Sequence, residues 1–141
     1  MYSVDTAVPS TFEAFLAAND LTHDHPNLEG WRRVWQNELQ VEATVPAVTP
    51  PCPAWCTLPA GHPYDSYDVG SDLPMTHLRG HVGFTAEHVQ VDATERSQDG
   101  AVTVDVPTAF VNVEDDLDPK AVRAFAADLL RAADELDRIT R

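Results

Sequence analysis

Basic residues, cysteine and glycine are scarce in this chain of 141 residues, and their scarcity excludes several classes of function. The 9 Lys and Arg residues face 23 Asp and Glu, so the formal net charge is −14. A chain this acidic is poorly suited to bind nucleic acid directly, because contact with phosphates requires a basic surface. No glycine-rich phosphate-binding loop, G-x-S-x-G motif or H-E-x-x-H motif is present. The sequence therefore carries no standard signature of nucleotide binding or hydrolysis.

Long apolar runs are absent as well. No stretch of about eighteen consecutive apolar residues occurs, so no transmembrane helix is predicted. Residues 1–5 carry no basic side chain and no apolar segment follows them, so we expect no secretory signal. These absences predict a cytoplasmic protein, in which a pair of cysteines more often binds metal than forms a disulfide.

The length suits one main domain with an N-terminal addition. We expect residues 1–45 to form a helical extension and residues 46–141 to form the main domain. Within the main domain, residues 64–74 are polar and contain glycine and proline, which predicts a mobile loop.

Two helices are predicted in the N-terminal extension. Ser10 is followed three residues later by Glu13, which is the spacing of a capping box, so a short helix is expected over residues 10–20. A second helix is expected to begin after Asn27. Its apolar residues are spaced by three and four and should pack inward. They are Leu28, Trp31, Trp35 and Leu39.

A three-stranded antiparallel meander is predicted over residues 89–113, because apolar and polar residues alternate there. The third strand is expected over residues 110–113. Turns are predicted at residues 98–100, where glycine tolerates a positive φ, and at Pro107, which cannot donate to a ladder. The first two strands are expected to point one apolar row each toward the core. These rows are Val89, Val91 and Ala93, and Val102, Val104 and Val106.

A C-terminal helix is predicted to cover the meander, which makes the expected fold class α+β. Asp118 is the expected N-cap, and Pro119 suits the first helical position because its missing N–H needs no partner there. Leu130 and Ile139 widen the apolar face of this helix, so we expect either a monomer or a helix-mediated homodimer. The stripe expected to face the sheet consists of Val122, Phe125, Ala126, Leu129, Ala133 and Leu136.

The most informative segment is C-P-A-W-C, residues 52–56, which contains both cysteines of the chain. Three of its six histidines, His62, His77 and His81, follow within thirty residues. This composition is typical of a zinc site with four ligands. Six prolines among residues 45–63 exclude a regular helix or a central strand. We therefore expect zinc to hold an otherwise irregular loop.

Residues 52–81 offer four metal ligands, and the identity of the fourth is open. Cys52 and Cys56 can approach one ion from a single turn, and His62 can return as the third ligand. The fourth ligand is His77 or His81. Because three residues separate the cysteines, instead of the common two, free cysteines and a strained local disulfide stay open as alternatives.

These motifs resemble a family of uncharacterised small domains from actinobacteria and their phages. The resemblance covers about residues 50–140 and rests on Cys-Pro-x-Trp-Cys, Gly-His-Pro-Tyr-Asp-Ser and Arg-x-His-x-Gly, followed by a valine-rich meander and a final helix rich in alanine and leucine. It implies no activity, because the family is a domain of unknown function. The ligands it implies are Cys52, Cys56, His62 and His81, in place of His77.

From these patterns we expect a noncatalytic zinc-binding accessory or regulatory protein, which acts by contact with an unidentified and basic partner protein. Two alternatives use different chemistry. An acidic nucleic-acid mimic would block a DNA-binding host or defence protein, because residues 85–117 hold eight carboxylates and only one basic residue, Arg96. A small zinc enzyme would keep an open metal position, with His77 or water as the fourth ligand.

Overall fold

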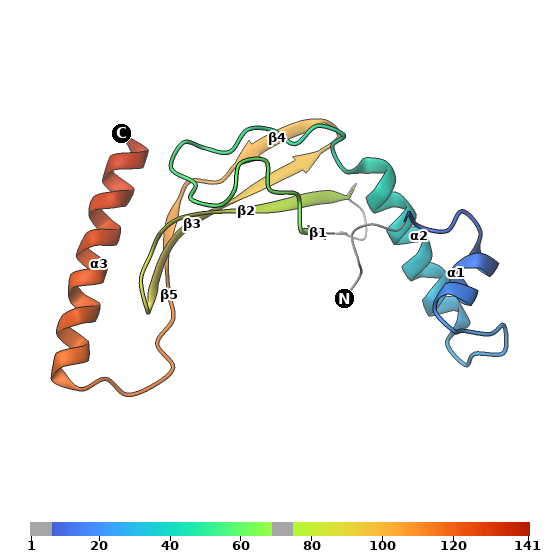
Figure 1. Ribbon diagram of the computed structural model, residues 1–141, viewed down its shortest axis with the longest axis horizontal. Helices are drawn as coiled ribbons and strands as arrows, with labels where there is room; N and C mark the ends of the chain where they lie inside the picture. Colours follow the sequence, from blue (N-terminus) through green and yellow to red (C-terminus); the bar gives the residue numbers. More distant parts are fainter. Residues whose placement is uncertain (1–6, 69–74) are drawn as a thin grey trace. The chain divides into compact units, whose positions relative to one another are not determined.

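The computed structural model in Figure 1 describes residues 7–68 and 75–141. Within these residues it contains three helices and one five-stranded antiparallel sheet, with the last helix packed on strands. The predicted α+β class is confirmed. The chain forms two compact units, Met1–Val45 and Pro46–Arg141. No helix in the described part of the chain is long and apolar enough to cross a membrane.

The Met1–Val45 unit contains both predicted N-terminal helices, α1 (Phe12–Ala18) and α2 (Leu28–Thr44). The expected cap of α1 is displaced by one residue, because the hydroxyl of Thr11, rather than Ser10, accepts a hydrogen bond from the backbone N–H of Ala14 at 3.2 Å. The core of this unit is formed by Phe12, Phe15 and Leu16, packed against Leu21, Leu28, Trp31 and Trp35.

The sheet belongs to the Pro46–Arg141 unit and has β3 at its centre, with β2 along one edge and both β4 and β5 along the other. A short β1 extends the sheet beyond β2. Three strands of the prediction are present, but the predicted number is wrong because β1 and β2 were not expected. Part of the predicted 64–74 loop forms β1, and residues 69–74 lie outside the described residues. The strands are β1 (Ser66–Asp68), β2 (Thr76–Thr85), β3 (Val89–Gln98), β4 (Ala101–Val104) and β5 (Thr108–Val111).

The strands β4 and β5 lie end to end along one edge of β3, not side by side as in a meander. The backbone N–H of Asp105 still donates to the carbonyl of Thr94 at 2.9 Å, so the edge continues past the end of β4. Pro107 then interrupts it, because proline has no N–H to donate. The predicted reversal at Pro107 is therefore wrong: the chain breaks its pairing there and resumes on the same side of the same strand.

Of the two apolar rows predicted to face the core, one is buried and the other is exposed. Val89, Val91 and Ala93 of β3 are buried, as expected. The second row is exposed, because β4 is an edge strand and, among the described elements, α3 packs on β3 and β5. The side chains of this exposed row are Val102, Val104 and Val106.

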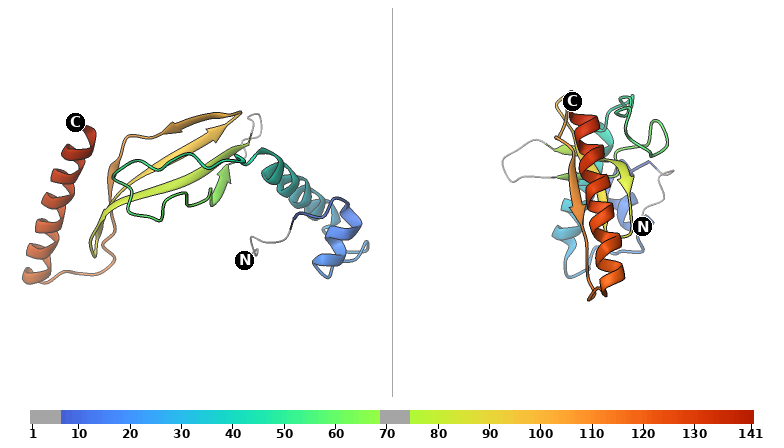
Figure 2. Two further views of the ribbon diagram at one scale, coloured as in Figure 1. Left: turned by 45° about the horizontal axis from the view of Figure 1, so that its top comes forward. Right: turned by 90° about the vertical axis from the view of Figure 1, so that its left-hand side faces the viewer.

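The helix α3 (Pro119–Thr140) begins as predicted, with a carboxylate oxygen of Asp118 accepting from the backbone N–H of Ala121 at 2.7 Å. It covers one end of the sheet (Figure 2). Ala132, with 1% of its surface exposed, packs there against Val89 and Val91. The partly buried side chains around this core are Phe84, Phe125, Leu136 and Ile139.

The face that α3 turns to the sheet differs from the predicted stripe. Phe125 and Leu136 do contact the core, but its centre is Ala132, which was not in the stripe. A small residue at this position allows the helix to approach the sheet closely. The remaining four residues of the predicted stripe are exposed: Val122, Ala126, Leu129 and Ala133.

Enlarging the central alanine should therefore destabilise the Pro46–Arg141 unit. Ala132→Leu adds three carbon atoms where the helix meets Val89 and Val91, and such overpacking costs about 1–3 kcal/mol. Urea denaturation measures the loss. The matched control is Ala127→Leu, five residues earlier in the helix and on another side of it, where the side chain is exposed and the expected change is within about 0.5 kcal/mol. Equal losses in the two variants would contradict this packing.

Candidate metal centre

The loop between α2 and β1, residues 46–65, has no helix or strand and lies along the sheet (Figures 1 and 2). Two turns shape it: the backbone N–H of Cys56 donates to the carbonyl of Pro53 at 3.0 Å, and that of His62 donates to Pro59 at 3.1 Å. The backbone N–H of Thr57 also donates to a carbonyl of β2 at 2.8 Å. The prolines thus prevent regular structure, while local turns and several hydrogen bonds to β2 fold the loop back on the sheet.

Four side chains converge where this loop meets β2. One ligand atom each from Cys52, Cys56, His62 and His81 lies within 4.8 Å of all the others. Cys56 Sγ and His62 Nε2 are 3.7 Å apart. In a tetrahedral zinc site, Zn–S distances of about 2.3 Å and Zn–N distances of about 2.0 Å separate ligand atoms by about 3.3–3.8 Å. The cluster therefore fits a metal ion after shifts of an ångström or less.

His81 supplies the second observation that fits a metal. Its side chain is fully buried, and its Nε2 lies 2.9 Å from Oε2 of Glu95. Its Nδ1 is buried and has no hydrogen-bond partner among the described residues. Buried polar atoms are nearly always satisfied, so an orphaned ring nitrogen on one of the four clustered side chains is well explained as a metal ligand.

Glu95 fixes the orientation of the His81 ring. Its carboxylate accepts hydrogen bonds from Tyr64 Oη at 2.6 Å and from Arg79 Nη2 at 2.8 Å, in addition to the contact with His81. Burial acts to raise the pKa of Glu95, but the hydrogen bonds from Arg79, Tyr64 and His81 together hold it below its ordinary value. A charged Glu95 favours a proton on Nε2 of His81, which leaves the lone pair of Nδ1 free for a metal.

Arg79 ties the loop to the sheet. Its guanidinium donates to the carbonyl of Pro50 at 2.9 Å and to that of His62 at 3.1 Å, on either side of the cysteine pair. It is completely buried and forms an ion pair with Glu95, which is 1% exposed. One buried cation thus connects the loop backbone to the carboxylate that orients His81.

The protonation states around the centre suit metal binding. Burial and the nearby charge of Arg79 lower the pKa of His62, which favours the neutral imidazole that metals require. Burial and the hydrogen bond to Glu95 raise the pKa of Tyr64 to about 12, so its hydroxyl remains a donor. Both shifts follow from the enclosure of the site by the loop and the sheet.

His77 is not part of the cluster. It lies on the same buried face of β2 as His81, four residues away, which corresponds to about 13 Å along a strand. Its ring instead lies edge-on to that of Tyr64, with centroids 6.2 Å apart. Both cysteines are free thiols and not joined in a disulfide. The structure therefore brings together the set that includes His81.

Trp55 covers the side of the centre that faces β2. Its ring meets His81 edge-on, with centroids 6.2 Å apart. Gly83 leaves room for it, since a Cβ atom at this position would lie 3.2 Å from Cε3 of Trp55. The register of β2 against β3 shifts between Val82 and Thr85, next to this contact.

The roles of three supporting residues were not predicted from the sequence: Tyr64 and Arg79 belong to the quoted motifs without an assigned role, and Glu95 was not singled out. Glu95 continues the inward row of β3 two residues after Ala93, so the period of the strand placed a carboxylate on the buried face. Arg79 precedes His81 by two residues and shares its face of β2. The alternation contained this signal, but a charged residue in a strand is ordinarily assigned to solvent.

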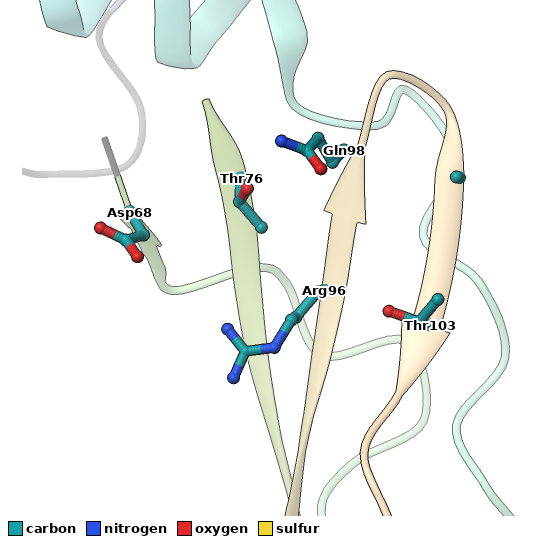
Figure 3. A pocket seen from close by; sticks show the side chains of 6 residues that line it. Asp68, Thr76, Arg96, Gln98 and Thr103 are labelled. Atoms are coloured by element: carbon teal, nitrogen blue, oxygen red, sulfur yellow. The ribbon is translucent and has the colours of Figure 1, made fainter. Parts of the chain in front are cut away.

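A hollow of about 190 Å³ lies elsewhere, over β1 to β4 (Figure 3). Arg96, its only basic side chain, is half-exposed and pairs with Asp105 at 3.2 Å. Because Arg96 follows Glu95 in β3, the two side chains point to opposite faces of the sheet. The hollow includes none of the four clustered side chains. It is lined by Asp68, Thr76, Arg96, Gln98, Ala101 and Thr103.

Comparison with known proteins gives one match. Residues 35–141 match a protein family described as a domain of unknown function, DUF6907. The match includes the whole Pro46–Arg141 unit and hence every residue of the candidate metal centre. Neither the curated proteins nor the solved structures gave a significant match.

Proposed function

The chain belongs to the DUF6907 family, whose description names no activity, and from the geometry of its site we propose that it is a noncatalytic binding module built around one structural zinc ion. The ligands in this proposal are Cys52, Cys56, His62 and His81. The unpartnered Nδ1 of the buried His81 is the observation that carries it.

Zinc suits this ligand set better than other common metals. Thiolate and imidazole ligands in tetrahedral arrangement are typical of zinc, whereas Ca²⁺ and Mg²⁺ prefer oxygen ligands. Structural zinc sites use four protein ligands, and catalytic sites keep one position for water or substrate. Four converging side chains therefore favour a structural role. The hollow beside Arg96 gives no support to an open-zinc enzyme, because no clustered ligand lines it.

The proposed role of the ion is to hold the 46–65 loop on the sheet. Three of the ligands come from this loop and one from β2, so metal binding closes the loop onto a strand. Among the described residues the loop has no helix or strand of its own, and only part of its backbone is hydrogen-bonded. Without the ion, two thiols and two imidazoles would face one another, and the loop would depend on its turns and on its hydrogen bonds to β2.

The proposed module acts by binding another protein. Its net charge of −14, concentrated in residues 85–117, favours a basic partner and disfavours direct contact with nucleic acid. Such binding should weaken as salt concentration rises, because exposed charges are screened. The proposed setting is the cytoplasm of an actinobacterium, or of such a cell infected by a phage, as the motif resemblance suggests.

Metal analysis tests the proposed ligands. Protein purified without an affinity metal should contain one zinc ion per chain by mass spectrometry. His81→Ala and Cys52→Ser should each lose most of the zinc, because three ligands remain. His77→Ala is the matched control, since His77 is also a buried histidine of β2 but lies outside the cluster, and it should retain the metal. Absence of zinc from the wild type, or retention by His81→Ala with loss by His77→Ala, would overturn the assignment.

A further inference from the structure

The helix α3 has a second apolar face, which the sheet does not cover. Its outer stripe exposes 49% of Val122, 37% of Leu129 and 69% of Leu130. Ala126 and Ala133 lie between them and are also exposed. Together these five residues, here called the outer stripe of α3, form a row along most of the helix. Isolated apolar residues on a surface need no explanation, but a continuous row marks an interaction site.

The spacing of this face is that of a helix-pairing seam. From Val122 the apolar residues continue at Ala126, Leu129 and Ala133, in steps of four, three and four. Alternating steps of three and four residues are what a second helix requires along its line of contact. Alanine at alternate positions of the seam lets two helix backbones approach closely, while valine and leucine fill the space between them.

The charge of α3 points to a second copy of this chain as the partner. Residues 118–141 hold five acids and five bases, although the whole chain carries −14. The helix is therefore the part of the surface where two copies can meet with little net repulsion. A strongly basic partner would gain more from residues 85–117, which hold seven carboxylates besides the buried Glu95 and one arginine.

Two of the unpaired charges of α3, which also include Lys120 and Asp134, indicate how the copies are arranged. Arg131 and Arg138 form ion pairs with Asp128 and Glu135 inside the helix. Arg123 and Asp137 are exposed and form no ion pair among the described residues. At 100° per residue they lie near the Leu130 edge of the outer stripe and away from the sheet.

An antiparallel pair with its two-fold axis near Leu130 would bring Arg123 of each copy opposite Asp137 of the other. The same axis sets Ala126 of one copy beside Ala133 of the other, where the backbones must be closest. In a parallel pair, Arg123 would instead face Arg123. Two-fold symmetry around one self-complementary patch is the commonest arrangement of homo-oligomers.

We propose that the chain forms a homodimer through antiparallel packing of the outer stripe of α3 about a two-fold axis near Leu130. A helix of 22 residues is about 33 Å long, so the contact is smaller than a standard interface and dissociation in the micromolar range is expected. No metal ligand belongs to α3, so the dimer goes beyond the proposed zinc function and is independent of it.

Sedimentation of the full chain over a range of concentrations tests this dimer. The wild type should shift from monomer to dimer as concentration rises from about 1 to about 100 μM. Leu130→Glu should raise the dimer dissociation constant about tenfold or more, since a charge would be buried at the axis. Its thermal melt and zinc content should match the wild type, because Leu130 is largely exposed and far from the ligands in sequence. The matched control is Ala127→Glu, an exposed alanine on another side of the helix, which should still dimerise.

A charge exchange tests the antiparallel arrangement. Arg123→Asp and Asp137→Arg should each weaken the dimer, and the double variant should recover most of the loss, because each pair is restored with its signs reversed. A wild type that stays monomeric at the highest concentration, or a Leu130→Glu variant that dimerises like the wild type, would overturn the proposal. Lack of recovery in the double variant would overturn the antiparallel arrangement. Zinc content is measured on the same samples, so failure of the dimer is separated from failure of the metal site.

Discussion

Removing the metal should lower the free energy of unfolding of the Pro46–Arg141 unit by on the order of 10 kcal/mol, because binding of a structural zinc ion is coupled to folding. The loss should be this large because three ligands lie in a loop without helix or strand and the fourth lies in the sheet. A change of this size is comparable to the whole stability of a typical domain. The metal-free unit should therefore be largely unfolded in its loop and markedly less stable in its sheet.

Thermal unfolding with and without a chelator measures this effect. Circular dichroism follows the sheet and α3, and one equivalent of added zinc should restore the original melt. The double variant Cys52→Ser and Cys56→Ser serves as the control, since it should melt like the chelated wild type and should not respond to chelator. A wild type whose melt is the same before and after complete metal removal would show that the ion is not structural.

Glu95→Gln should be the most damaging single change outside the ligands, with a loss of about 3–5 kcal/mol. The change keeps the shape of the side chain but leaves Arg79, a fully buried cation, without its counter-charge. It also replaces the carboxylate that accepts the hydrogen bond from Nε2 of His81. Loss of such a supporting carboxylate typically lowers metal affinity by about 10- to 100-fold.

Two measurements separate these effects. Urea denaturation reports stability, and competition with a zinc indicator reports affinity. Glu87→Gln provides the matched control, because this glutamate, in the loop just before β3, has 84% of its side chain exposed and should change neither quantity appreciably. The lowered pKa of Glu95 also sets the sign of a pH effect. Its contribution is present at neutral pH and is lost as the pH falls below the ordinary carboxyl range, and the variant should lack this dependence.

Some of the fold could be predicted because single residues decide it. Asp118 and Pro119 determine the start of α3, and the spacing of Trp31 and Trp35 identifies α2. β2 was missed because its buried face is not apolar: alternate positions hold His77, Arg79 and His81. An alternation that depends on ion pairs and on candidate metal ligands cannot be recognised from hydrophobicity.

The predicted orientation of α3 was wrong for a different reason. Apolar residues occur on two sides of this helix, so its amphipathic pattern is wide enough to fit more than one face. The contact with the sheet is decided by the small side chain of Ala132, which carries little weight in a hydrophobic pattern. The larger Leu129 was predicted to face the sheet and is exposed.

The metal centre was more accessible to sequence reasoning than the polar residues that support it. Cysteine and histidine are rare in this chain, so their grouping within thirty residues stands out. The choice of His81 over His77 depends on where each histidine lies along β2, which cannot be read from the composition of the segment. Glu95 and Tyr64 lie far from the cysteines in sequence, and only the pairing of β2 with β3 and the return of the loop bring them together.

The interruption between β4 and β5 affects how readily copies of this chain can pair through their sheet edges. This outer edge is rich in β-branched and aromatic side chains, and Val104, Val106 and Phe110 are all exposed. An unbroken strand of that composition would be a template on which further chains stack into fibrils. Pro107 offers no N–H, and the N–H of Asp105 is already directed inward to Thr94. An incoming strand thus finds only short stretches to pair with, so we expect little edge-to-edge aggregation at high concentration.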